Sequence, residues 1–254
     1  MNQRRRQNAT WANVGSPVAN LCAQAEALCQ KIAPRDLAGL PVYVVPQSAL
    51  LADLGTAEAC DGYTTPSLDL YLRDVIGLAW PGRGPCMVIN DLVLLDEAPD
   101  DLETYFLATV LHELAHVFER PALYRERPDA GPARLMFEAL LLAQIVAEPP
   151  SSEEGRASLP HHGQRFIRAA LHLRHRAEAS GVCIAAALIC PNRDYGLSHA
   201  NACYAALPDE PIRLADARIR DVLASPPPEE FSRLWADDLA HWLSHHVAEK
   251  EKIA

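Results

Sequence analysis

Two histidines and a glutamate near the middle of the chain have the spacing of a zinc-hydrolase motif. The segment reads His112-Glu113-Leu114-Ala115-His116. On a helix, residues four apart project from one face, so both imidazoles can reach the same tetrahedral zinc ion. Glu113, about 100° further around the helix, can take a proton from water that zinc activates. The motif predicts a Zn²⁺-dependent hydrolase with His112 and His116 as ligands and Glu113 as general base.

The helix that carries this motif is expected to be deeply packed. Its predicted bounds are 101–119, with Asp100 as a cap, acidic residues at the positive end of the helix dipole and a stop before Pro121. Histidines on an apolar helix need hydrogen-bond partners or a metal ion. The apolar residues around the motif are Phe106, Leu107, Val110, Leu111, Leu114, Val117 and Phe118.

A catalytic zinc ion needs a third protein ligand, and the sequence offers two candidates. His162 lies at the start of a helix predicted at 161–179, while Glu138 lies on a strongly apolar helix predicted at 133–147. A glutamate in such a helix is costly to bury unless it binds something. If His162 is the ligand, Glu138 is free to accept a hydrogen bond from a histidine ring. The candidates for stabilising an oxyanion are Tyr124, Tyr195 and His199.

The motif together with His162-Gly163-x-x-Phe166 resembles the SprT-like (Spartan-type) family of zinc metallopeptidases. The resemblance covers residues 86–178. It implies a strand before the active helix, His162 as the third zinc ligand, and Phe166 packed beneath the site at the start of a second helix. The alternative is the gluzincin arrangement, in which Glu138 completes the zinc site.

These elements predict an α+β, zincin-like fold, with a small mixed β-sheet packed on the active helix. Three regions are expected: a flexible tail at 1–15, a metallopeptidase domain at 16–180 and a mainly helical C-terminal extension at 181–254. The remaining predicted elements are helices at 16–32, 211–224 and 228–249, and strands at 40–45 and 86–90.

Composition and charge narrow the possible partners. The 254 residues are 49% hydrophobic and 22% charged, which is ordinary for a globular protein, and the net charge of −10 disfavours nucleic-acid binding. A group of arginines on the 161–179 helix is expected to form an exposed face, and two histidines there are expected at the surface. These residues are Arg165, Arg168, Arg174, Arg176, His172 and His175.

Cysteine usage suggests a reducing compartment. The seven cysteines are odd in number and include no C-x-x-C pair, so neither a disulfide framework nor a zinc ribbon is indicated. Cys22 and Cys29 lie on one face of the first helix and are expected in the core. With no signal peptide or membrane span in the sequence, we expect a soluble, cytoplasmic protein.

The function predicted from the sequence is that of a zinc metallopeptidase acting on a protein or peptide substrate. Two alternatives come from other classes: a catalytically inactive zincin-fold binding or scaffold protein, and a zinc hydrolase that acts on another amide. The presence of Glu113 argues against the inactive alternative, because a purely structural zinc site has no use for that carboxylate.

Overall fold

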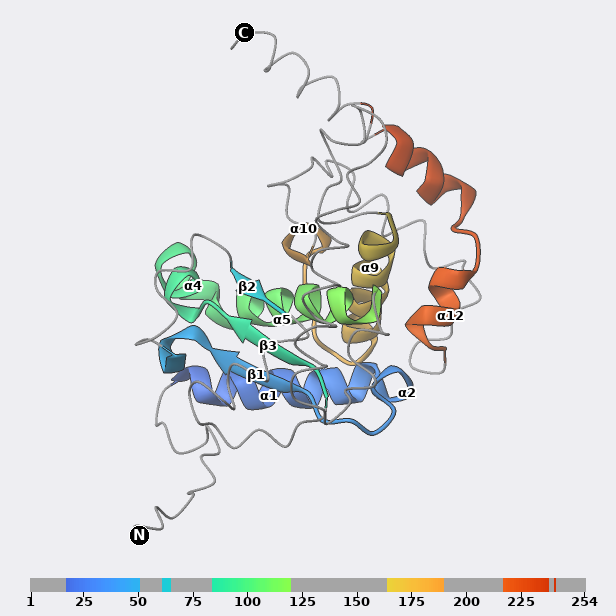
Figure 1. The fold of residues 1–254 in the computed structure, drawn as a ribbon. Helices are drawn as coiled ribbons and strands as arrows, with labels where there is room; N and C mark the ends of the chain where they lie inside the picture. The colour runs from blue at the N-terminus through green and yellow to red at the C-terminus, as the bar shows by residue number, and fades with distance from the viewer. Residues whose placement is uncertain are drawn as a thin grey trace, which may run out of the picture.

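The computed structural model describes residues 17–50, 61–64, 84–119, 164–189, 217–237 and 240. The fold is α+β, mostly helical with a three-stranded sheet (Figure 1). The strands are β1 (Tyr43–Pro46), β2 (Gly62–Tyr63) and β3 (Cys86–Ile89). The helices are α1 (Pro17–Ile32), α2 (Pro34–Leu37), α4 (Asp91–Glu97), α5 (Leu102–Glu119), α9 (Gln164–Ala179), α10 (Ala186–Ile189) and α12 (Ile219–Ala224), with short 3-10 turns at Gln47–Leu50 and Pro99–Asp101. Residues 229–237 are also helical.

The sheet is mixed, in the order β1-β3-β2. The central strand β3 pairs parallel with β1 and antiparallel with β2. All four β3 residues are apolar and buried, as expected for a strand covered on both faces. The approach to β3 requires a glycine: Gly84 has φ +94°, and a Cβ on it would lie 1.8 Å from the carbonyl oxygen of Pro41.

Helix α5 occupies the centre of the molecule. It packs against β2 and β3 and also against α9 and α10, while α1 packs against β1 and α5 (Figure 1). Phe106, Leu111 and Leu114 on α5 have no exposed surface. The helix predicted at 101–119 and the strand predicted at 86–90 are confirmed, and the buried apolar residues of α5 place this helix inside the core.

The first helix is confirmed with its two core cysteines. Cys22 and Cys29 are 2% and 0% exposed, and burial raises the pKa of each thiol to about 12. A thiol with so high a pKa is a weak nucleophile and behaves as a small apolar side chain.

The prediction of an exposed arginine face on α9 is wrong for Arg168 and Arg176, whereas Arg165 is exposed, as predicted, and Arg174 is half-buried. Arg168 and Arg176 are each 3% exposed, and their guanidinium groups bind the C-terminal part of the chain instead. The hydrogen bonds run from Arg165 to the carbonyl of Leu223 (3.1 Å), from Arg168 to that of Ser225 (2.7 Å) and from Arg176 to that of Ala217 (2.7 Å). Arginine suits this role because its rigid fork offers five N–H donors, so one side chain can bind several backbone carbonyls.

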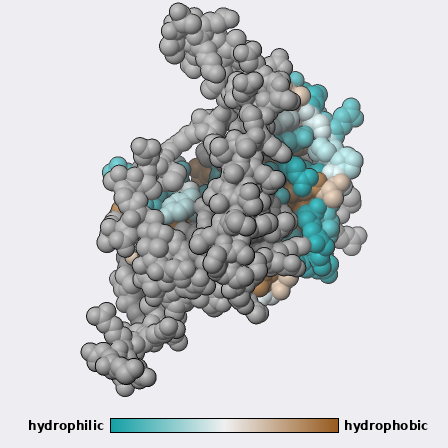
Figure 2. Space-filling view, in the orientation of Figure 1, coloured by the Kyte–Doolittle hydropathy of each residue, from teal (hydrophilic) through white to brown (hydrophobic). Residues whose placement is uncertain are grey.

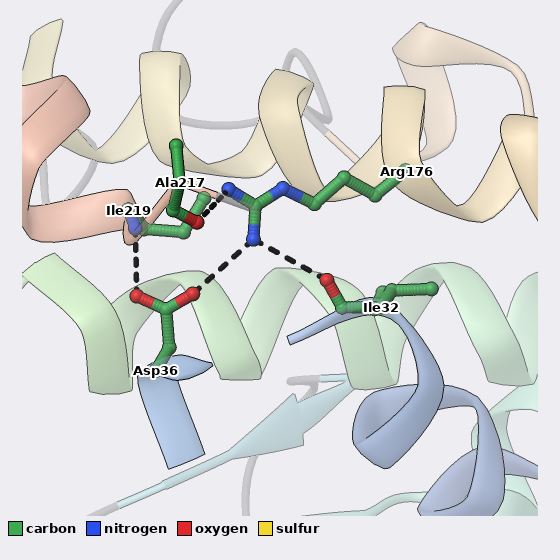
Figure 3. A network of polar contacts seen from close by, with 5 residues as sticks. All are labelled: Ile32, Asp36, Arg176, Ala217 and Ile219. Carbon is green, nitrogen blue, oxygen red and sulfur yellow. Dashed lines mark hydrogen bonds and ion pairs between the residues drawn. The ribbon is translucent and has the colours of Figure 1, made fainter. Parts of the chain in front are cut away.

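One of these arginines also joins three distant segments (Figure 3). The Arg176 guanidinium contacts the carbonyl of Ile32 and the carboxylate of Asp36, at 3.3 and 3.2 Å. The same carboxylate accepts the backbone N–H of Ile219 at 2.6 Å. Arg176 and Asp36 therefore hold the start of α12 against the end of α1.

Residues on both sides of the predicted boundary at 180/181 share one hydrophobic cluster. Ile184, Ile219 and Phe231 are buried in the cluster that α1, α5 and α9 form. The outer surface of α12 and of the helical residues 229–237 is hydrophilic (Figure 2). No helix in the described part of the chain combines the length and apolar character that a bilayer crossing needs.

Several local details differ from the predictions. Helix α4 follows β3 at once, because the Asn90 side chain accepts the N–H of Val93 and so caps a new helix. Helix α5 begins after a 3-10 turn rather than at a capped Asp100. Residues 217 and 218 precede α12 instead of lying within a helix. His172, expected at the surface, is 3% exposed because its face of α9 packs into the core.

Candidate metal centre

His112 and His116 lie on one face of α5, as their spacing predicts. Their ring centroids are 5.1 Å apart and the ring planes are inclined at 76°. Both side chains are half-buried, whereas the α5 residues between them are buried. The two imidazoles are thus more exposed than the residues that separate them on the helix.

Phe166 packs against both histidine rings. Its ring centroid lies 4.8 Å from that of His112 and 4.2 Å from that of His116, and the residue has no exposed surface. Because α9 begins at Gln164, Phe166 lies in its first turn. This is the aromatic contact that the resemblance implies, and it brings the start of α9 to the histidine pair.

A backbone carbonyl orients one of the histidines. The Nδ1 atom of His112 lies 2.7 Å from the carbonyl oxygen of Ile189, the last residue of α10. A carbonyl oxygen only accepts, so Nδ1 is the donor and carries the proton. In the neutral ring, the lone pair is then on Nε2, which is the form that a metal ion binds when the other nitrogen donates to a carbonyl.

Glu113 lies deeper than the histidines, with 5% of its surface exposed. Burial, with a smaller contribution from the charge of Asp61, raises its pKa from 4.5 to about 8, while a hydrogen bond from the backbone amide of Thr64 acts in the opposite direction. A carboxyl group with a pKa near neutrality can both accept a proton and return it, which is the requirement for a general base that later acts as an acid.

The groups beside Glu113 belong to β2 and its flanks. Gly62 lets this strand approach α5 closely, since a Cβ on it would lie 2.8 Å from Cγ2 of Thr109. The strand is aligned by the amide of Asn90, which donates to the carbonyl of Asp61 at 2.8 Å. Because β2 lies close to α5, the backbone amide of Thr64, next to this strand, can donate a hydrogen bond to the carboxyl group of Glu113.

The structure brings His112, His116 and Phe166 into contact, and it places the Glu113 carboxyl group, on the same helix, beside the Thr64 amide. The candidate third ligands His162 and Glu138 lie outside the described residues, as do Tyr124, Tyr195 and His199. Within the described ranges, no three His, Cys, Asp or Glu side chains form a metal-binding group. Nothing in the sequence indicates the roles of the Ile189 carbonyl and the Thr64 amide, because both are backbone groups that almost every residue carries.

Comparison with known proteins adds no relative. The sequence matches no protein-family model, and neither curated proteins nor solved structures give a match.

Proposed function

We propose that this chain is a zinc metallopeptidase of the SprT-like, zincin type, with His112 and His116 as zinc ligands. The observation that carries the proposal is the common environment of the two rings. Both contact Phe166, and His112 donates from Nδ1 to the carbonyl of Ile189. In histidine ligands of zinc, the ring nitrogen that does not bind the metal typically donates a hydrogen bond of this kind to a carbonyl or carboxylate.

The residues fit a zinc ion by their chemistry. Two imidazoles from one helix face provide nitrogen donors, and a third ligand is assigned to His162, two residues before the start of α9. Glu138 is the alternative third ligand. A zinc ion held by these residues supplies Lewis acidity, which lowers the pKa of water and polarises an amide carbonyl.

Glu113 is assigned the proton transfers. As general base it accepts the proton of the attacking water, and as general acid it returns that proton to the leaving amine. The Thr64 amide and the buried surroundings keep the carboxyl group in place. A divalent cation held by the neighbouring histidines would lower the pKa of this carboxyl group from about 8 and so favour its charged, proton-accepting form.

The decisive experiment combines metal analysis with one substitution. We expect about one zinc per chain in protein purified without chelators or a His-tag. Glu113→Gln should keep that zinc and lose peptidase activity by about 10²–10⁴-fold on a panel of fluorogenic peptides and an unfolded protein. The matched control is Glu103→Gln, the same change at an exposed position of the same helix, which should leave activity unchanged.

Other outcomes would separate the alternatives. Activity of Glu113→Gln near the wild-type rate would refute the assigned base. Zinc binding with no cleavage of any peptide would favour a scaffold protein or a hydrolase of another amide. Absence of zinc after reconstitution would refute the metal centre. Zinc analysis of His162→Ala and Glu138→Ala chooses the third ligand.

A further inference from the structure

The connection between α9 and α10 links the candidate metal centre to a charged residue of α9. Residues 181–189, termed the α9–α10 bracket, begin at Gly181, whose φ of +98° turns the chain away from α9. The amides of Gly181 and Val182 close the end of α9 on the carbonyls of Glu178 and Ala177. The bracket ends at Ile189, whose carbonyl accepts the hydrogen bond of His112.

The bracket is fixed between these two points. The Nε of Arg174 donates to the carbonyl of Ile184 at 2.7 Å, and only 13% of the arginine side chain is exposed. The side chains of Ile184 and Ile189 are 2% and 0% exposed, so they anchor the same stretch in the core. Arg174 also has an ion pair with Glu178, but this lies at the surface.

We propose that Arg174 is a positioning residue for the metal centre, holding the bracket so that the Ile189 carbonyl meets Nδ1 of His112. This inference rests on the proposed function. The carbonyl keeps the proton on Nδ1 and the lone pair on Nε2, where a ligand needs it. When the carbonyl shifts, the neutral ring distributes its proton over both nitrogens and rotates, and zinc then binds only the fraction with the correct tautomer and orientation.

The first test compares two substitutions at one ion pair. Arg174→Met removes the bond to Ile184, whereas Glu178→Gln removes only the surface ion pair and leaves that bond intact. Disturbing the groups that orient zinc ligands typically weakens metal binding 10- to 100-fold, so we expect Arg174→Met to raise the zinc dissociation constant about tenfold. Glu178→Gln should stay within about twofold of wild type, since an exposed ion pair contributes little.

A second readout works without metal. Nitrogen NMR of the full-length protein, freed of metal with a chelator and measured at pH 8, reports the tautomer of each imidazole. The signals of His112 are assigned as those that are lost in His112→Asn. Wild type and Glu178→Gln should show the Nδ1-protonated form. Arg174→Met should show a mixture of both tautomers, a change that general destabilisation of a folded protein does not produce.

A second pair of variants covers the case in which Arg174→Met fails to fold. Gly181 and Gly39 both have positive φ, +98° and +79°, and a Cβ on either meets nothing within 4 Å. Alanine at either position therefore strains the backbone without a clash. Only Gly181→Ala disturbs the bracket, so only this variant should change the His112 tautomer and weaken zinc binding.

Each outcome decides the inference. A wild-type tautomer and zinc affinity in folded Arg174→Met, or in Gly181→Ala where Arg174→Met does not fold, would overturn it. Equal weakening by Glu178→Gln would also overturn it, because charge rather than the bracket would then be responsible. If the wild-type chain binds no zinc, the proposed function fails, while the tautomer of the metal-free protein still tests the bracket.

Discussion

Removing the guanidinium of Arg176 should destabilise the protein more than any change to a surface arginine. Arg176→Met leaves the Asp36 carboxylate buried without its cation, and it leaves the carbonyls of Ile32 and Ala217 without this donor. The two side chains of the pair are only 2% and 5% exposed. Removing one partner of a buried ion pair lowers the free energy of unfolding by about 3–5 kcal/mol. This is a large share of the total, because the free energy of unfolding of a domain is usually about 5–15 kcal/mol.

The assay is urea unfolding of chelated protein, followed by circular dichroism at one pH. The matched control is Arg233→Met, which removes an arginine whose ion pairs with Glu230 and Asp237 are solvent-exposed. A fully exposed ion pair contributes little to stability, so this variant should unfold close to wild type. In Arg176→Met, the backbone amides of α12 should show the largest increase in hydrogen-exchange rate. The reason is that the N–H of Ile219, at the start of α12, bonds to Asp36, whose position depends on Arg176.

A double variant tests the electrostatic reasoning itself. Burial raises the pKa of Asp36 and lowers that of Arg176, in each case against their mutual attraction, so the pair is costly to keep charged. Asp36→Asn/Arg176→Met removes both charges of this pair, and the amide oxygen that replaces the carboxylate can still accept the N–H of Ile219. The double variant should therefore cost less than the sum of the single variants by about 2 kcal/mol. A loss for Arg176→Met no greater than that of Arg233→Met, or strict additivity, would refute the reasoning.

Three further changes have expected outcomes. Gly62→Ala should lower the free energy of unfolding by about 1–3 kcal/mol because of the clash with Cγ2 of Thr109, and Gly62→Ala/Thr109→Ser should recover part of it if that contact is the cause. Phe166→Ala should lower the free energy of unfolding by about 3–5 kcal/mol and weaken zinc binding, whereas Phe166→Leu should have a smaller effect on both. Equal zinc affinity in wild type and both variants would exclude a role of Phe166 at the site. Burial raises the pKa of Glu26 above 4.5, so the folded state takes up a proton first as pH falls, and the charged form costs stability at neutral pH. Glu26→Gln should therefore unfold at a higher temperature than wild type at pH 7, with the difference disappearing near pH 4; a constant difference at both pH values would contradict this assignment.

The parts of the fold that the sequence predicted well are those with a strong local pattern. The helix predicted at 101–119 is α5 at Leu102–Glu119, and the strand predicted at 86–90 is β3 at Cys86–Ile89. Long apolar segments bounded by proline or acidic residues carry their own signals. In contrast, β2 comprises two residues, Gly62 and Tyr63, and exists only because β3 and α5 provide its neighbours.

The error about the arginines of α9 has a different cause. Their charge and helical spacing are those of a solvated face, which is the commoner arrangement. What buries Arg168 and Arg176 is a set of carbonyls from segments far away in the chain, at Ser225, Ala217 and Ile32. Nothing in the sequence around 165–176 shows that such acceptors will be near, since every residue has a carbonyl.

The same limit applies at the candidate metal centre, and it explains which of its features a sequence can reveal. The groups assigned to chemistry, His112, Glu113 and His116, must be particular side chains, so their types and spacing are visible. The groups that orient them are the carbonyl of Ile189 and the amide of Thr64, whose identity is set by the path of the backbone. A substitution near such a carbonyl or amide acts by moving the backbone, so the structure, rather than the motif, tells which positions control the histidines and the glutamate.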